Sequence, residues 1–262
     1  MRKLHRLVPH RRPLRRSISQ ASRKEFQSHI FSWWKTHRRD LPWRHTHDPY
    51  KIFVSEIMLQ QTQVSRVIPK YLEFIHQYPT VNSLAKASTS DVLRLWKGMG
   101  YNRRALYLKK SALLGEIPKT EKELMKLPGV GKYTARAILV FAYKQDIAMV
   151  DTNIRQILTH FFFGDAPQKE KVIQQVADQL LPKGKSWEWH QALMDYGAME
   201  LEKIPGVIKK QKKFKNSNRY FRGKLMDILR EGPVKEYSSP IVTGLIKDGL
   251  VVKKDGMLLL PD

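Results

Sequence analysis

Two carboxylates in this sequence stand where acid–base chemistry is possible. Glu56 lies in the apolar stretch 53–59, and Asp151 follows the apolar stretch 147–150 and directly precedes an expected helix. A buried Glu56 could carry a proton at neutral pH, whereas a carboxylate beside a helix N-terminus is favoured in its ionised form. Hydrolysis of a glycosidic bond uses such a pair, in which one carboxyl group is protonated and the other is ionised.

Each carboxylate also has an interpretation without catalysis. Helical periodicity alone favours a solvent-facing Glu56, because acidic side chains are seldom buried. Asp151 is equally well explained as the N-cap of the helix that follows it. If both groups are catalytic, an N-glycosidic bond to a nucleobase would suit the same chemistry, once the base has been flipped from its stack.

Between the two carboxylates lies a glycine hairpin, Gly129-Val-Gly131. Thr120 and Glu123 predict a capping box for a short helix that Pro128 ends, and a second helix is expected from about Tyr133. Two glycines followed by free helix N–H groups can hold a phosphate, as helix-hairpin-helix elements do with DNA backbone. The alternative is a tight turn between two helices.

Composition favours a polyanionic partner. The 262 residues carry a net charge of +24, with a pI near 10.1, and nucleic acid explains this better than membrane. No apolar run approaches the length of a membrane-spanning helix. The absence of cysteine excludes disulfides and cysteine-ligated iron–sulfur clusters, and His45 and His47 lack a third metal ligand nearby.

The expected fold class is all-α, with two helical subdomains flanking a cleft that carries the helix-hairpin-helix motif. Ser22 and Glu25 predict the start of the first helix, and Asp48-Pro49 the start of the second. Further helices are expected at about 65–78, 82–87, 90–96, 101–115, 152–163, 168–181 and 186–200.

The expected domain order has four parts. Residues 1–24, basic and without acids, are interpreted as a disordered arm on phosphates or as an organellar targeting segment. The body, 25–202, divides into a six-helix core at about 48–150 and a second subdomain from 25–47 and 151–202. A basic linker, 203–218, precedes a tail, 219–262, with helices near 219–231 and 238–248 and a hairpin at Asp255-Gly256. The tail is either a trimmed winged helix or a docking subdomain without DNA contact.

Six stretches in order resemble the helix-hairpin-helix DNA glycosylases, and most closely the MutY-type adenine glycosylases. They are Leu-Pro-Trp-Arg at 41–44, Val-Ser-Glu-Ile-Met-Leu-Gln-Gln-Thr-Gln-Val at 54–64, Gly-Met-Gly-Tyr at 98–101, Leu-Pro-Gly-Val-Gly-Lys-Tyr-Thr-Ala at 127–135, Val-Asp-Thr-Asn at 150–153 and Leu-Met-Asp-Tyr-Gly-Ala-Met at 193–199. The resemblance covers residues 26–200.

This resemblance implies roles for individual residues. Glu56 matches the acid that protonates adenine N7, Asp151 the carboxylate that stabilises the sugar cation, and Asn153 the side chain that holds Asp151 and water. Gln61 and Tyr101 match residues that wedge into the base stack. The wall of the adenine pocket is matched by Trp43, Arg44 and Leu59. The phosphate clamp is matched by Gly129, Gly131 and Thr134, with Lys132 as a neighbouring DNA-binding lysine.

Tyr133 and three departures limit what the resemblance implies. Tyr133 stands where bifunctional relatives carry a Schiff-base lysine, so water should be the nucleophile and lyase activity weak or absent. Leu201 stands at the first position of the usual four-cysteine iron–sulfur loop. The C-terminal 8-oxoguanine recognition domain is replaced by about 40 residues, and Asp-Thr-Asn replaces Asp-Gly-Asn.

The resulting expectation is a monofunctional, monomeric DNA glycosylase that removes adenine opposite guanine or 8-oxoguanine. The alternatives are a thymine or uracil glycosylase acting opposite guanine and a non-catalytic DNA-binding protein. The expected partner is double-stranded DNA with a mismatch or lesion, without a membrane partner. We expect no cofactor and no catalytic metal, although the hairpin could hold a structural monovalent cation. The expected location is intracellular and DNA-associated, in cytoplasm or nucleoid, with organellar targeting by the basic N-terminus as an alternative.

Overall fold

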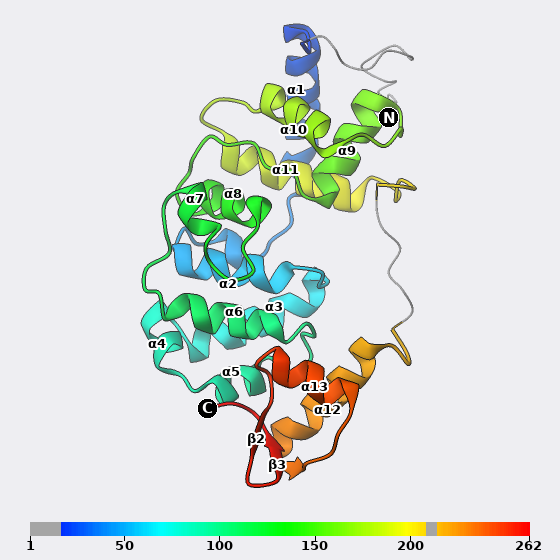
Figure 1. Cartoon of the computed structure of the whole chain (residues 1–262). Coiled ribbons are helices and arrows are strands. Elements are labelled where there is room, and N and C mark those ends of the chain that lie inside the picture. The colour runs from blue at the N-terminus through cyan, green and yellow to red at the C-terminus, as the bar shows by residue number, and fades with distance from the viewer. Residues whose placement is uncertain (1–16, 208–213) are drawn as a thin grey trace. The chain divides into compact units, whose positions relative to one another are not determined.

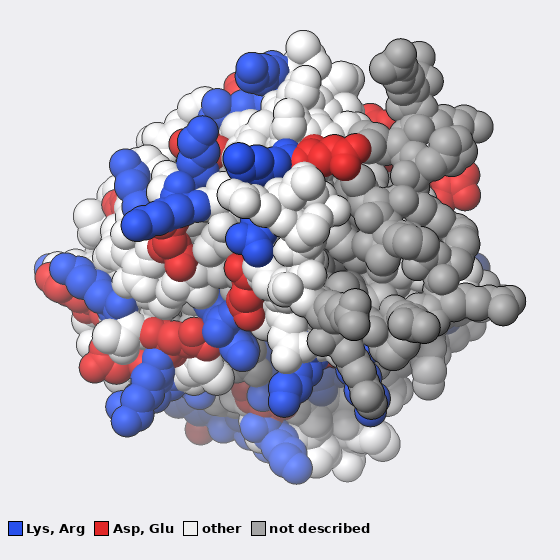
Figure 2. Space-filling model, turned by 90° about the horizontal axis from the view of Figure 1, so that it is seen from above, with Lys and Arg blue, Asp and Glu red and all other residues white. Residues whose placement is uncertain are grey.

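The computed structural model describes residues 17–207 and 214–262 (Figure 1). The chain divides into two compact units, one within 1–41 and 132–210 and the other within 42–131 and 211–262. Of the expected basic arm and linker, residues 1–16 and 208–213 lie outside the described residues, which hold all but eleven of the 48 lysines and arginines. On the face shown in Figure 2, basic side chains lie among acidic ones instead of forming one patch.

The first unit is built from helices joined by loops in its described part. Phe26, Ile154 and Trp189 are fully or almost fully buried in its core, where Phe26 makes edge-to-face contacts with Trp189 and other rings. Its helices are α1 (Gln20–His37), α8 (Lys132–Phe141), α9 (Thr152–Phe163), α10 (Glu170–Leu180) and α11 (Ser186–Met199).

The second unit holds the remaining helices and a small sheet. Its first part comprises the 3-10 helix η1 (Pro42–Arg44), α2 (Pro49–Leu59), α3 (Val64–Gln77), α4 (Val81–Lys86), α5 (Thr89–Leu95), α6 (Arg103–Ala112) and α7 (Glu121–Leu124). The C-terminal part adds α12 (Asn218–Glu231), β1 (Val234–Lys235), α13 (Pro240–Lys247), β2 (Val252–Lys254) and β3 (Met257–Leu259). An all-α body with a winged-helix-like tail is therefore confirmed.

The tail sheet has the strand order β1-β3-β2, and both pairs are antiparallel. Asp255 and Gly256, with φ of 52° and 71°, form the turn between β2 and β3. The hairpin was predicted, whereas the two-residue strand β1 was not. Such a short strand leaves almost no alternation in the sequence by which to recognise it.

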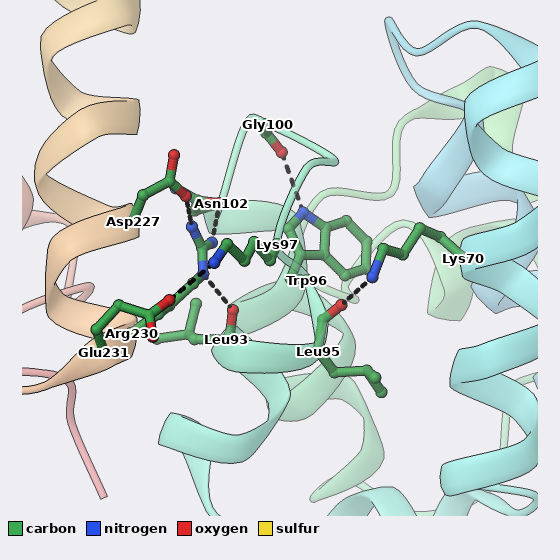
Figure 3. A network of polar contacts seen from close by, with 10 residues as sticks. All are labelled: Lys70, Leu93, Leu95, Trp96, Lys97, Gly100, Asn102, Asp227, Arg230 and Glu231. Atoms are coloured by element: carbon green, nitrogen blue, oxygen red, sulfur yellow. Dashed lines mark hydrogen bonds and ion pairs between the residues drawn. The ribbon is translucent and has the colours of Figure 1, made fainter.

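Arg230 on α12 attaches the tail to α5 and to the start of α6 (Figure 3). Its guanidinium donates to the Leu93 carbonyl at 2.8 Å and to Asn102 Oδ1 at 2.9 Å. Lys97 and Glu231 add an exposed ion pair at 2.8 Å. Because Arg230 is buried and hydrogen-bonded to backbone, the tail is a docked part of this unit.

Several predicted boundaries need correction. Ser19, whose hydroxyl accepts from Ser22 N–H, is the N-cap of α1 in place of Ser22, so the arm cannot extend to residue 24. Helix α8 and the segment up to residue 150 cluster with the first unit and not with a core at 48–150. The predicted linker also overlaps α12, which begins at Asn218.

Candidate active site

Glu56 lies in the middle of α2 and its side chain is buried. Asp48 caps this helix by accepting from Tyr50 N–H at 2.9 Å, and Pro49 occupies its first turn. The solvent-facing position that periodicity favoured for Glu56 is wrong. Helix α2 packs against η1, α3 and α6, so that every residue from Ile52 to Met58 is buried and no face is left for solvent.

The predicted wall of the base pocket lies beside this helix. Trp43 and Arg44, in η1, are both buried, and η1 packs against α2. The Trp43 ring meets Tyr71 edge to face, with 5.5 Å between ring centroids. Leu59 ends α2 and is partly buried. The structure therefore brings the predicted pocket residues to the helix that carries Glu56.

Gln61 and Tyr101, the two expected wedge residues, are exposed and have left-handed backbones with φ of 54° and 44°. This conformation is uncommon for residues other than glycine, and it costs about 1–3 kcal/mol when the surroundings enforce it. Both residues therefore sit in strained turns, an arrangement that often accompanies a functional loop.

One buried arginine, which was not predicted from the sequence, holds both turns. Arg104 donates to the Gln60 carbonyl at 2.7 Å in the first turn, and to the Met99 carbonyl at 2.9 Å and the Gly100 carbonyl at 3.1 Å in the second. It also donates to the Met58 carbonyl at 2.7 Å, at the end of α2. Burial lowers the pKa of Arg104 to about 10, so it stays charged at neutral pH.

The glycine hairpin follows α7, whose N-cap Thr120 accepts from Glu123 N–H as predicted. Gly129 has φ of +77°, and a Cβ there would stand 2.3 Å from the Tyr107 ring. A Cβ at Gly131 would meet nothing within 4 Å. The fold therefore requires glycine at position 129 but not at position 131. The open space at Gly131 leaves room for a ligand to approach the backbone.

The residues after the hairpin begin α8 in the first unit. Lys132 is exposed, Tyr133 is partly exposed and Thr134 is buried. Backbone N–H groups in a helix's first turn lack intrahelical acceptors, so this helix start offers donors to an anion. Lys132 is the more exposed of the first two residues of this helix.

Asp151 is the N-cap of α9, and each of its carboxylate oxygens accepts a hydrogen bond. Oδ1 accepts from Ile154 N–H at 2.7 Å and Oδ2 accepts from Asn153 Nδ2 at 3.0 Å. Burial raises the pKa of Asp151, while these two donors and the charge of Arg39 oppose the rise without cancelling it. The helix N-terminus thus acts on the pKa of Asp151 in the expected direction, but burial outweighs it.

The segment 147–150 that leads to Asp151 is fixed by three side chains. Arg136 and Gln174 both donate to the Ala148 carbonyl, at 2.8 and 3.0 Å. His190 Nε2 accepts from Met149 N–H at 3.0 Å, while its Nδ1 lies 2.7 Å from the Ser186 carbonyl. Burial lowers the pKa of His190 to about 4, so it is neutral and its Nε2 can accept.

Gly197 allows α11 to approach α9 at Asn153. A Cβ on Gly197 would lie 2.8 Å from the Asn153 carbonyl oxygen and 3.0 Å from its Cβ. Asp195, two residues earlier on α11, is fully buried and accepts from Trp34 Nε1 at 2.9 Å and from Arg39 Nε at 2.5 Å. The matching stretch 193–199 thus supports the position of Asn153 and holds Arg39, whose charge acts on Asp151.

The predicted site residues therefore fall into two groups. The second unit carries the acid, the pocket wall, the wedges and the glycines: Glu56, Trp43, Arg44, Leu59, Gln61, Tyr101, Gly129 and Gly131. The first carries Lys132, Tyr133, Thr134, Asp151 and Asn153. The pairing of Glu56 with Asp151 spans the two units and stays a prediction.

Comparison with known proteins identifies the family of this chain. Residues 54–183 match the model of the HhH-GPD superfamily base excision DNA repair protein. An adenine DNA glycosylase of Mycolicibacterium smegmatis is 35% identical over 232 residues, covering 77% of this chain and 79% of that one. The chain belongs to the HhH-GPD superfamily of base excision DNA repair proteins.

Two further relatives carry a different activity in their names. A thymine/uracil-DNA glycosylase of Methanothermobacter thermautotrophicus is 36% identical over 187 residues, covering 68% of this chain and 85% of the other. The solved structure of a thermostable thymine-DNA glycosylase has a TM-score of 0.63 at 35% identity, over 68% of this chain and 86% of that one. The protein is thus a DNA glycosylase, a hydrolase of N-glycosyl bonds.

The iron–sulfur cluster that the MutY-type resemblance implies does not fit this HhH-GPD chain. The sequence contains no cysteine to ligate one. Leu201, at the expected first cysteine position, packs against the core of the first unit. Nearby, Ile204 is buried and its N–H donates to Gln156 Oε1 at 3.2 Å. Apolar packing and a backbone hydrogen bond thus hold this loop against α9.

Arg104, His190 and Gly197 were not predicted from the sequence as supporting residues. Arg104 closely follows the matching stretch 98–101 and Gly197 lies inside the stretch 193–199, so proximity to matching stretches was the available signal. His190 gave no such signal, because a single histidine is usually a satisfied core residue.

Neither a membrane-spanning helix nor a metal-binding cluster is present in the described residues. No helix within 17–207 and 214–262 is long and apolar enough to cross a bilayer. In the same ranges, no three His, Cys, Asp or Glu side chains are grouped so that they could hold a metal ion.

Proposed function

We propose that this DNA glycosylase removes adenine mispaired with guanine or 8-oxoguanine, by hydrolysis. The burial of Glu56 within α2 supports this proposal most directly. A buried carboxyl group tends to keep its proton, and a purine offers N7 to receive it. The adenine DNA glycosylase of Mycolicibacterium smegmatis, similar over 79% of its length, adds support.

In the proposed mechanism Glu56 donates its proton to adenine N7. The glycosidic bond then breaks with its electron pair passing to the base, which leaves neutral. Asp151, ionised, stabilises the cation that develops on the sugar. Water, held by Asn153, adds to the sugar carbon and gives its extra proton to the Glu56 carboxylate. Each group thereby returns to its starting state.

The wedge residues and the glycine hairpin would bind the DNA in this mechanism. Gln61 and Tyr101, held in strained turns by Arg104, fill the space that the flipped base leaves, and this offsets part of the unstacking cost of a few kcal/mol. Gly131 and the start of α8 bind backbone phosphate. Tyr133 cannot form an imine with the sugar, so strand cleavage by the enzyme should be weak or absent.

Excision of thymine or uracil opposite guanine is the second candidate. It is favoured by the thymine/uracil-DNA glycosylase relative and by the similar thymine-DNA glycosylase structure. Glu56 separates the two candidates, since pyrimidines lack the N7 that it would protonate. A non-catalytic DNA-binding protein would be favoured if both Glu56 and Asp151 proved dispensable.

Single-turnover base release on four duplexes tests the proposal. The duplexes carry A opposite 8-oxoguanine, A opposite G, T opposite G and U opposite G, each assayed with and without alkali. Adenine release with strand breaks only after alkali supports the proposal. Release of T or U alone overturns it in favour of the second candidate. We further propose that the enzyme acts as a monomer on intracellular double-stranded DNA.

A further inference from the structure

A large groove in the second unit lies between the wedge turns and the docked tail. It has a volume of about 1010 Å³. Gln61 and Tyr101 line one part of it, while Arg219 and Arg222 of α12 line another. Glu56 is not among the lining residues. The groove is therefore separate from the buried acid, although it shares the expected wedge residues.

The groove is strongly basic. Its lining includes six arginines, Arg66, Arg103, Arg104, Arg219, Arg222 and Arg230, and two acids, Asp227 and Asp248. Asp248 pairs with both Arg222 and Arg103, and Asp227 pairs with Arg230. Arginine excess of this kind favours a phosphate-bearing ligand, because the guanidinium fork matches phosphate oxygens.

Aromatic rings flank one of these arginines. Arg219 donates a 2.6 Å hydrogen bond to the Tyr101 hydroxyl and lies 5.7 Å from the Tyr101 ring centroid and 5.9 Å from that of Phe214. Phe214 and Tyr101 are 57% and 39% exposed. Exposed rings beside arginine form the kind of surface on which nucleobases stack.

The two sides of the groove are held together before any ligand binds. Arg230 bonds α12 to Leu93 and Asn102, and Asn102 directly follows Tyr101 (Figure 3). Arg104 fixes the turns of Gln61 and Tyr101 from inside the unit. A preformed site loses less conformational entropy on binding than a site that must order itself.

We propose that this groove binds the nucleotide that faces the flipped base and stays in the duplex. Arg66, Arg219 and Arg222 contact its phosphates, and its base stacks against Tyr101 and Phe214. The flipped nucleotide must reach Glu56, which lies outside the groove, whereas the wedge residues face the nucleotide left behind. This inference rests on the proposed function only for the wedge role of Gln61 and Tyr101.

Binding without catalysis tests the groove. A duplex with a stable abasic analogue and 2-aminopurine in the facing position is titrated with wild type, Arg219→Ala and Lys224→Ala. Lys224 is an exposed cation on α12 outside the groove lining. We expect Arg219→Ala to weaken binding about tenfold and Lys224→Ala less than twofold. Equal losses, or no loss with Arg219→Ala, would overturn the proposal.

Fluorescence of the facing 2-aminopurine tests stacking. Wild type should change it on binding, and Phe214→Ala should lose at least half of that change at saturating protein. An unchanged signal in Phe214→Ala would contradict the proposed base contact. Thermal unfolding checks that each variant is folded. Since no step requires base release, these results can fail independently of the duplex panel that tests adenine excision.

Discussion

The side-chain amide of Asn153 donates a 3.0 Å hydrogen bond to the Asp151 carboxylate. This contact favours the ionised form of Asp151, whose pKa burial raises. In the proposed mechanism base release needs that ionised form, so its rate should fall as pH drops through the raised pKa. Because the Asn153 hydrogen bond stabilises the charged form, the rate should begin to fall at a lower pH than it would if burial acted alone.

Asn153→Ala should therefore move the acidic limb of the rate profile upward. Loss of one hydrogen bond worth about 1 kcal/mol corresponds to a shift of roughly 0.7 pH unit. Single-turnover rates between pH 4 and 8 measure the limb, and Thr152→Ala, at the exposed neighbouring position, is the control. If the rate of Asn153→Ala fell at the same acidic pH as that of wild type, the Asn153 amide would not influence the pKa of Asp151.

Glu56→Gln should bind mismatched duplex nearly as wild type does and lose base release by a factor of about 10²–10⁴. The amide fits the same buried space but cannot donate the proton, and this range is typical for loss of a general acid. Affinity and single-turnover rate are measured on one duplex. Glu73→Gln, an exposed acid on α3, is the control. Near-normal turnover in Glu56→Gln would refute the acid role.

Replacing the two hairpin glycines by alanine should have different effects. Gly129→Ala forces a left-handed alanine, at a cost of about 1–2 kcal/mol, and presses on Tyr107, so it should lower the free energy of unfolding. Gly131→Ala meets open space and should change stability by less than about 0.5 kcal/mol. Its methyl group should nevertheless weaken DNA binding. Urea unfolding and DNA titration separate the effects, and full-affinity binding by Gly131→Ala would argue against phosphate approach there.

His190 should make stability depend on pH in the mildly acidic range. Its pKa is about 4 in the folded protein and ordinarily 6.5, so the unfolded chain binds the proton first. The contribution of neutral His190 to the free energy of unfolding is fully present above pH 6.5 and is lost as pH falls toward 4. The loss is on the order of 3 kcal/mol.

Urea unfolding at several pH values measures this loss. His190→Gln keeps a side-chain acceptor for Met149 N–H but does not titrate. Its stability should therefore vary less than that of wild type between pH 6.5 and 4, even if it is lower at pH 7. Parallel profiles for the two proteins would assign the loss to other groups.

The basic N-terminal residues should contribute to the salt dependence of DNA binding. Because Ile18 is buried and Ser19 caps α1, the informative deletion is 1–16 and not 1–24. It removes seven Lys and Arg. For every phosphate that these residues neutralise, the deletion should reduce the slope of log affinity against log salt by about 0.9. An unchanged slope would show that the segment does not touch the DNA backbone.

The sequence by itself determined the elements and the family. Capping residues such as Asp48 and Thr120 act within a few residues, so helix starts could be predicted locally, although Ser22 was chosen where Ser19 caps. The order of six matching stretches sufficed for the glycosylase assignment and for the candidate residues. No three-dimensional contact was needed for either.

Only the tertiary structure decided the surroundings of those residues. Glu56 is buried because three elements cover α2, and periodicity within one helix cannot report what packs against it. Arg104 donates to residues 42 to 47 positions away, and Gly197 lies against Asn153, 44 positions away. No local sequence pattern encodes these contacts. The docking of α12 through Arg230 likewise depends on partners 128 and 137 residues distant. Long-range packing thus sets the environment of the candidate residues that short-range sequence signals had indicated.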